Sequence, residues 1–104
     1  MIKEFINPLT HEDRVRCRIE IMKGKIADFM VQYEISQAGD WNVVVRFDTF
    51  HGILHRDLQN PDGTSQKQWL AHTNFDEGLN FSYNHIVENW EKYRDWYFSR
   101  LDLK

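Results

Sequence analysis

The sequence predicts an α+β protein: a five-stranded antiparallel β-meander followed by one long C-terminal helix packed on one face of the sheet. Three observations predict it. Runs of strand length alternate apolar and polar side chains between residues 14 and 58, Gly-containing turn signals separate these runs, and after residue 74 the apolar period changes from 2 to about 3.6. A sheet and a helix that each bury one face form two layers. We therefore expect one domain over 1–104, with the sheet at 14–70 and the helix at 75–101.

Composition limits the class of protein. With 104 residues, of which 41% are hydrophobic and 14% aromatic, the chain can bury one packed core. A net charge of −3 argues against broad nonspecific nucleic-acid binding. Cys17 is the only cysteine, which excludes an intramolecular disulfide and a cysteine-based zinc site. There is neither an apolar run long enough for a bilayer nor a signal peptide, so we expect a cytoplasmic protein that does not enter a membrane.

Residues 1–13 form an irregular N-terminal arm in this prediction. Asn7-Pro8 disfavours a helix, because the residue before proline avoids the helical region. The arm could dock through Phe5, Ile6 and Leu9 or remain mobile, and both alternatives stay open.

The first two strands are expected at 14–22 and 26–35. A two-residue loop between them would set Asp28 opposite Ile19, whereas a three-residue loop at 23–25 sets Phe29 there. We favour the three-residue loop, because it keeps one face of the sheet apolar.

A turn at 37–40 leads to the third strand, and pairing Ile35 with Trp41 would place Phe29 beside Phe47. Between the fourth and fifth strands, Asn60-Pro61-Asp62-Gly63 has the residue order of a type I turn. That turn would place Trp69 opposite Leu54 in the core.

The C-terminal helix has a stripe of apolar side chains, with Thr73 or Asn74 as the cap. Phe81 and Trp96 fall outside the stripe. We expect Trp96 to be covered by another chain, which predicts a homo-oligomer that associates through this helix face. The stripe consists of Phe75, Leu79, Tyr83, Ile86, Trp90, Tyr93, Tyr97 and Leu101.

The central hairpin carries the candidate site. If His51-Gly52 is a two-residue loop, Asp48 lies opposite His55 and Arg46 opposite Asp57. These four side chains then share the polar face, away from the helix.

An aspartate beside a histidine orients the imidazole for proton transfer, and an arginine can hold a phosphate bidentately. Metal-independent RNA cleavage needs such parts, with His51 or His72 as a further proton-transfer group. The alternative is that the four residues Arg46, Asp48, His55 and Asp57 form ordinary cross-strand ion pairs on an exposed sheet face.

We expect no metal and no other cofactor. His51, His55 and Asp57 are the candidate ligands, but side chains four residues apart do not converge along a strand. A second basic feature, formed by Arg14, Arg16 and Arg18, could follow a phosphate backbone or protect an edge strand from aggregation, and we favour the edge strand.

Several stretches resemble a group of small, uncharacterised bacterial and archaeal proteins, over roughly residues 29–98. More loosely, the arginine–aromatic–aspartate strand, the histidine-containing strand and the C-terminal helix are similar to TumE-like toxin components. This sequence departs from their pattern in having His51 and His55 near an Arg56-Asp57 pair instead of a compact histidine cluster. This resemblance implies a toxin-like protein that acts on RNA and has an antitoxin partner, with Arg46, Asp48 and His55 at matching positions. The stretches are 31–34, 44–49, 51–52, 55–57, 60–63 and 89–94.

Three functions therefore remain open. The first is a toxin–antitoxin component, enzymatic or not. The second is a non-catalytic homo-oligomeric interaction module, and the third is a binder of a small ligand on the polar face of the sheet. The sequence does not decide whether the protein is an enzyme.

Overall fold

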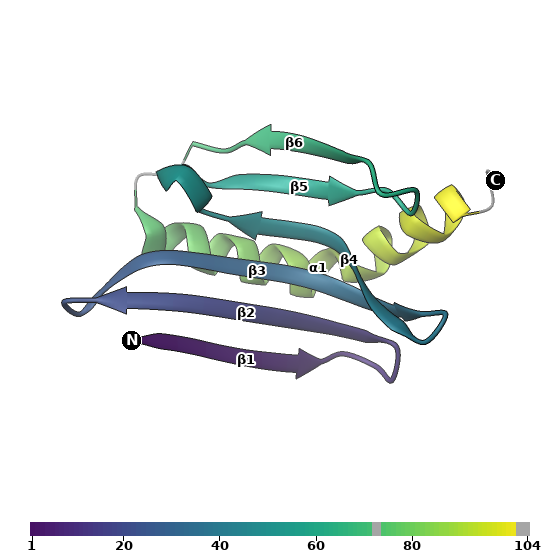
Figure 1. The fold of residues 1–104 in the computed structure, drawn as a ribbon, viewed down its shortest axis with the longest axis horizontal. Helices are drawn as coiled ribbons and strands as arrows, with labels where there is room; N and C mark the ends of the chain where they lie inside the picture. The colour runs from purple at the N-terminus through teal and green to yellow at the C-terminus, as the bar shows by residue number, and fades with distance from the viewer. Residues whose placement is uncertain (72–73, 102–104) are drawn as a thin grey trace.

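A computed structural model describes residues 1–71 and 74–101, except for the side chain of His51. It is an α+β fold with one open antiparallel sheet and a long helix behind it (Figure 1). Each strand pairs with the next along the chain, so the predicted meander is confirmed, with six strands where we expected five. The elements are β1 Ile2–Pro8, β2 Asp13–Met22, β3 Lys25–Gln37, β4 Asp40–Asp48, a 3₁₀ turn η1 Phe50–Gly52, β5 His55–Gln59, β6 Ser65–Trp69 and α1 Phe75–Leu101.

The additional strand is β1, which corrects the expected irregular arm. It pairs with β2 from Ile2 opposite Glu20 to Pro8 opposite Arg14. Most of its side chains are exposed, so its sequence lacks the clean alternation that marks a strand with one buried face. Of the three residues expected to dock, Leu9 packs against the core, and the Phe5 ring lies 6.4 Å from that of Tyr83 on the helix.

The register of the β2–β3 hairpin is confirmed, with Phe29 opposite Ile19. The loop itself has two residues, Lys23 and Gly24, both with positive φ angles of 52° and 75°. Lys25, which we assigned to the loop, instead pairs with Met22, and the register shifts by one residue at an irregularity between Glu20 and Ile21. This shift gives the rest of the hairpin the same register as a three-residue loop, so the apolar face is preserved.

The expected β3–β4 register was wrong by two residues in the centre of the sheet. Val31 lies opposite Phe47, and Tyr33 lies opposite Val45. The two-residue turn at Ala38-Gly39 shifts the register by one, and the extra residue Val44 shifts it once more. Two shifts of one residue add up to an even number, so each side chain stays on the face of the sheet that we predicted although its cross-strand partner changes.

The expected pairing of Trp69 with Leu54 in the core was also wrong. The Asn60 amide donates to Thr64 O (2.8 Å), and Gly63 adopts a φ of 91°, so the loop has one residue more than a simple four-residue turn. A type I turn needs this left-handed residue to join two twisted strands. As a result, Trp69 lies opposite His55 on the polar face and is 55% exposed.

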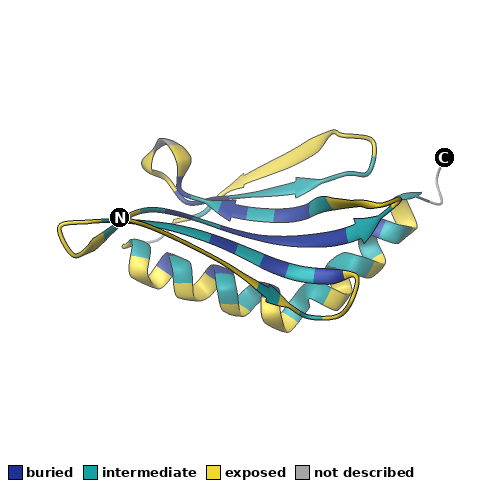
Figure 2. Ribbon diagram, turned by 60° about the horizontal axis from the view of Figure 1, so that its bottom comes forward, coloured by how far each residue is buried: buried dark blue, intermediate teal, exposed yellow. Residues whose placement is uncertain are grey.

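The core lies between the centre of the sheet and α1, as Figure 2 shows by the dark blue segments of the middle strands. The helix begins at Phe75 as predicted, and Asn74 is its cap, because its Oδ1 accepts from the Glu77 amide at 2.8 Å. The alternative cap, Thr73, lies outside the described residues. Buried residues that confirm the predicted core are Phe29, Val31, Val45, Phe47 and Ile86, while Trp90 is partly buried against them.

The premise for association through Trp96 is not met. Its side chain is partly buried, packs against the core cluster and lies under the guanidinium of Arg100, whose Cζ is 5.6 Å from the ring centroid. Phe81 remains 42% exposed, but its ring meets that of Phe47 at 6.1 Å. Both aromatics thus have intramolecular contacts, and association of two copies stays a prediction. Among the described residues, no helix has the length and apolar character needed to cross a membrane.

Candidate functional site

The four candidate residues meet on adjacent strands. Asp48 lies opposite His55, and Arg46 lies opposite Asp57, which confirms the predicted register. The connection is longer than the expected two-residue loop, because the 3₁₀ turn η1 replaces it. Thr49 fixes this turn to β3: its amide donates to Phe29 O, and its hydroxyl accepts from the Phe29 amide at 3.0 Å.

His55 is almost completely buried, with 2% of its surface exposed. We expected an exposed histidine, and the difference follows from the β5–β6 register, since the Trp69 ring covers the imidazole at a centroid distance of 5.1 Å. One ring nitrogen, Nδ1, lies 3.1 Å from Ile53 O. The other, Nε2, faces two carboxylates, at 2.9 Å from Asp48 Oδ1 and 3.4 Å from Asp57 Oδ2.

The two carboxylates are held differently. Asp48 Oδ1 also accepts from the Phe50 amide at 3.0 Å, so η1 fixes its position. Asp57 Oδ1 is buried and has no hydrogen-bond partner among the described residues. A buried carboxylate oxygen without a partner is costly, and in native sites it commonly marks the place of a missing donor, water or cation.

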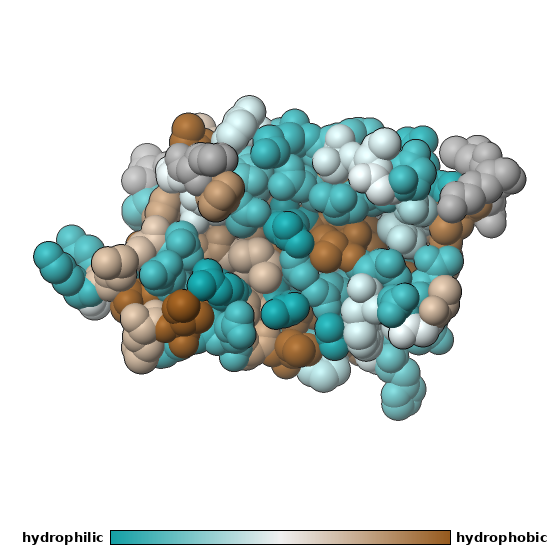
Figure 3. All heavy atoms as spheres, viewed as in Figure 1, coloured by the Kyte–Doolittle hydropathy of each residue, from teal (hydrophilic) through white to brown (hydrophobic). Residues whose placement is uncertain are grey.

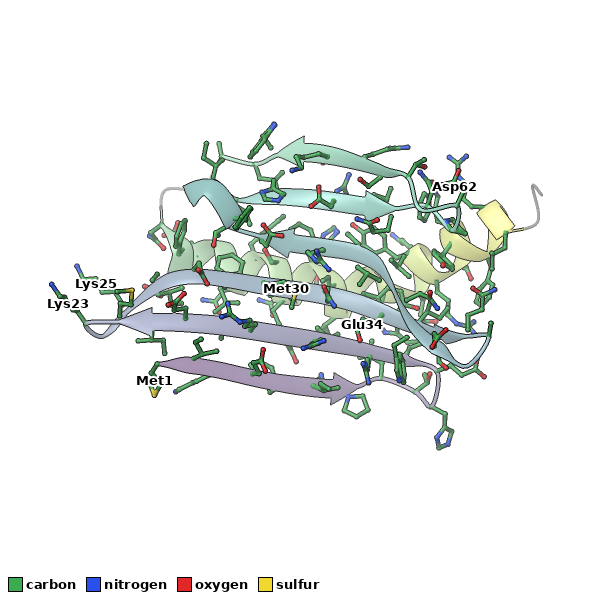
Figure 4. All side chains as sticks on the ribbon, viewed as in Figure 1. Met1, Lys23, Lys25, Met30, Glu34 and Asp62 are labelled. Atoms are coloured by element: carbon green, nitrogen blue, oxygen red, sulfur yellow. The ribbon has the colours of Figure 1, made fainter. Side chains whose placement is uncertain are left out.

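Arg46 is oriented by a buried network that the sequence did not reveal. Its Nε donates to Gln32 Oε1 at 2.8 Å, and Gln32 Nε2 donates to Glu34 Oε2. Glu34 in turn pairs with Arg14 Nε at 2.6 Å. Gln32 and Glu34 are each 3% exposed, although they lie on the polar face. Figure 4 labels Met30 and Glu34 along β3, and Gln32 lies between them in sequence.

The expected basic stripe is divided by ion pairs. Arg18 lies 3.7 Å from both Glu4 and Asp28, and Arg14 is bound to Glu34. Since β1 covers β2, this strand is not an edge strand either. The stripe therefore offers fewer free cations than its sequence suggests.

A cavity of about 370 Å³ opens on this face beside the candidate residues. The face is mostly hydrophilic with scattered apolar residues, as Figure 3 shows from the side opposite the helix. Lys67 of β6 lines the cavity, with its ammonium 5.3 Å from the Trp69 ring centroid. No carboxylate among the described residues lies within ion-pair distance of Lys67 or Arg46. The lining residues are Arg18, Asp28, Phe29, Met30, Arg46, Asp48, Phe50, His55, Asp57 and Lys67.

This arrangement changes what His55 can do. The Ile53 carbonyl can only accept, so Nδ1 carries a hydrogen. Carboxylates also only accept, so a neutral imidazole would turn a lone pair toward two anions at Nε2. A proton or a cation shared between Nε2 and the two carboxylates satisfies this arrangement, and the role of His55 in proton transfer stays a prediction. The side chain of His51 and all of His72 lie outside the described residues.

The described residues with metal-ligand chemistry that come together are Asp48, His55 and Asp57, whose ligand atoms all lie within 4.8 Å of one another. The predicted cross-strand register already brought these three side chains together, but the sequence analysis weighed only His51, His55 and Asp57 as metal ligands. Asp48, on the opposite strand, takes the place that His51 had in that set.

A second polar group, which the sequence analysis missed, lies under the helix. His85 Nε2 is 2.7 Å from Tyr93 Oη, and Arg56 Nη1 donates to the same hydroxyl at 3.2 Å. Burial, and secondarily the positive charge of Arg56, lower the pKa of His85 below its ordinary value. It contacts the rings of Phe47 and Phe81, so we regard it as a packed core histidine.

The fold and site define a small α+β protein with one open antiparallel sheet, a helix on one face and a charged pocket on the other. Within that class the chain belongs to the DUF7718 family, a domain of unknown function, whose family profile matches residues 1–102. No curated protein and no solved structure matches the chain.

Proposed function

We propose that the pocket binds and cleaves a phosphodiester of single-stranded RNA, and that the protein is the toxin component of a cytoplasmic toxin–antitoxin pair. The observation that carries the proposal is the juxtaposition of two cations without ion-pair partners among the described residues, Arg46 and Lys67, with the Asp48–His55–Asp57 cluster in one cavity. The toxin role is supported by the loose resemblance to TumE-like toxins, in which Arg46, Asp48 and His55 stand at matching positions.

Arg46 is suited to hold the phosphate. Gln32 occupies its Nε, which leaves the two terminal nitrogens without a hydrogen bond to any described side chain. A planar guanidinium with two parallel donors matches two phosphate oxygens. Because the network behind Gln32 is buried, the side chain is oriented before a ligand arrives.

Cleavage would proceed by attack of the ribose 2′-oxygen on phosphorus. A P–O2′ bond forms and the P–O5′ bond breaks, while the 2′-hydroxyl proton passes through a carboxylate of Asp48 or Asp57 to the leaving 5′-oxygen. Arg46 and Lys67, which line the same cavity, stabilise the negative charge that develops on the phosphate oxygens. The product end is a 2′,3′-cyclic phosphate.

The test compares growth arrest and cleavage of a mixed-sequence single-stranded RNA by the wild type, Arg46→Lys and Lys67→Ala. We expect arrest by the wild type, relieved by co-expression of the gene adjacent to it in its genome. Both variants should be impaired at least tenfold, since a point charge does not replace a planar fork and since Lys67 is exposed and not needed for the fold. Arg16→Lys, on the same face but outside the cavity, is the matched control.

Equal arrest and cleavage by all the variants, or no activity of the wild type, would contradict the proposal. His55→Ala is less informative than the sequence suggested, because His55 is buried and its loss would destabilise the hairpin. RNA binding should weaken as salt rises, with the shallow slope of a site that contacts one or two phosphates.

A further inference from the structure

The centre of the pocket places one imidazole nitrogen beside two carboxylates. His55 Nδ1 is committed to Ile53 O, so the neutral imidazole presents its Nε2 lone pair to the cavity side of the hairpin. A backbone carbonyl on one ring nitrogen is the usual support of a histidine whose other nitrogen binds a metal. The contact with Ile53 O therefore favours the tautomer with the hydrogen on Nδ1, which leaves Nε2 free to bind a metal.

The distances at Nε2 have the size of a coordination sphere. Two ligand atoms that lie about 2.0–2.2 Å from one metal, at angles of about 90–110°, are roughly 2.9–3.5 Å apart. Nε2 lies 2.9 Å from Asp48 Oδ1 and 3.4 Å from Asp57 Oδ2. The three ligand atoms all lie within 4.8 Å of one another, so the two carboxylates would move toward each other for all three atoms to bind one cation.

The surroundings also favour a cation over a shared proton. Asp57 Oδ1 is buried without a partner, and the side chain of His55 is only 3% exposed. A single proton on Nε2 leaves the second carboxylate poorly satisfied at 3.4 Å, whereas a divalent cation balances both negative charges. Asp48 is already fixed by the Phe50 amide, as a ligating carboxylate usually is.

We propose that Asp48, His55 and Asp57 bind one divalent first-row transition metal, with Mn²⁺ and Zn²⁺ as the ions that suit one imidazole and two carboxylates. Three protein ligands leave at least one position open toward the 370 Å³ cavity, where Arg46 and Lys67 also lie. A phosphate oxygen would bind there. The metal site rests on the hairpin geometry alone, and only this phosphate ligand rests on the proposed function.

The experiment titrates the full-length protein, freed of metal with a chelator, with Mn²⁺, Zn²⁺ and, for comparison, Mg²⁺ in a calorimeter. We expect saturation at one equivalent with Mn²⁺ or Zn²⁺, and binding at least tenfold weaker for Mg²⁺, which rarely takes a histidine ligand. The thermal midpoint should rise with the concentration of the ion that binds.

Asp57→Asn and His55→Gln keep the side-chain volume, and each should weaken binding at least tenfold. Asp28→Asn is the matched control, since Asp28 lines the cavity but pairs with Arg18, and it should bind within twofold of the wild type. Circular dichroism and the unfolding midpoint establish that each variant is folded. No saturable binding by the wild type, or equal binding by Asp57→Asn, His55→Gln and the wild type, would overturn the metal site.

Failure of the metal site and failure of the proposed function give different results. One equivalent of metal without RNA cleavage would support the site and remove the nuclease. RNA cleavage that is unchanged by chelator, with no metal bound, would keep the nuclease and overturn the site. Cleavage that is lost in chelator and restored by Mn²⁺ or Zn²⁺ would support both.

Discussion

Phe47 is the residue through which the sheet meets the helix. It is 1% exposed, and its ring contacts those of Phe81 and His85 on α1. Truncation of such a side chain loses the transfer free energy of the ring and leaves a cavity. The sequence predicted this burial correctly, because parity along β4 decides the face even when the cross-strand partner is misplaced.

We predict that Phe47→Ala lowers the free energy of unfolding by about 3–5 kcal/mol. The measurement is urea denaturation followed by circular dichroism. Met22→Ala, at the exposed end of β2, serves as the control and should change stability by less than about 0.5 kcal/mol. A loss below about 1 kcal/mol for Phe47→Ala would mean that the ring is not in the core.

His85 makes stability depend on pH. Its folded pKa is lowered by burial and by Arg56, with Glu88 acting in the opposite direction, and Tyr93 and Asn89 are the other polar groups that face it. Below its unfolded pKa of about 6.5, the unfolded chain takes up a proton that the folded chain resists. The stability that the neutral His85 contributes is therefore fully present above the unfolded pKa. It is lost as the pH falls from the unfolded pKa to the lower folded pKa.

We predict that the wild type loses more stability between pH 7.5 and pH 5.5 than His85→Gln does. Glutamine can still hydrogen-bond to Tyr93 but cannot be protonated. The comparison is the difference in urea midpoints at the two pH values for each protein. An identical difference in both would show that His85 does not resist protonation in the fold.

At the scale of the elements, turn chemistry decided which expectations held. The shared face of Asp48 and His55 could be placed from sequence, because it depends only on parity and on keeping Val45 and Phe47 inside. Their direct pairing followed from centring the turn on His51-Gly52, and the longer connection keeps that centre. The burial of His55 could not, because it depends on one additional loop residue at Gly63, which brings Trp69 over the imidazole. The Gln32–Glu34 network was equally hidden, because polar residues on a polar face look exposed in sequence.

The helix supplies a test at this scale. Asn74→Ala removes the side-chain acceptor of the Glu77 amide and should cost about 0.5–2 kcal/mol. Asn80→Ala makes the same substitution at an exposed position inside α1, where alanine favours the helix, so stability should stay equal or rise. The measurement is the free energy of unfolding of both variants, obtained by chemical denaturation under the same conditions. Equal losses would show that Asn74 does not act as the cap.

At the scale of the whole molecule, β1 protects an edge. Its backbone pairs with β2 along seven residues, although most of its side chains are exposed. Without it, the hydrogen-bonding edge of β2 would be open to pairing with another chain.

The helix fits this sheet without a long overhang, because β3 has 13 residues, or about 43 Å of strand, against about 40 Å of helix.

We predict that deletion of residues 1–8 lowers the unfolding midpoint and causes concentration-dependent association, measured by urea denaturation and light scattering. The double variant Ile2→Ser and Ile6→Ser alters exposed side chains but keeps the backbone pairing, so it should behave like the wild type. If the deletion stays monomeric and the double variant associates, apolar side chains and not the strand edge control association.

The order of the elements has a consequence for the newborn chain. All six strands pair with their sequence neighbours, and the helix that covers them is the last element. At roughly 5–20 residues per second, the ribosome needs about 1.5–5 s to add the 27 residues of α1, whereas a hairpin closes in about 1–10 μs. Until the helix is complete, the sheet has Val31, Tyr33 and Phe47 uncovered, so this interval during translation is when its apolar face is open to contact with other chains.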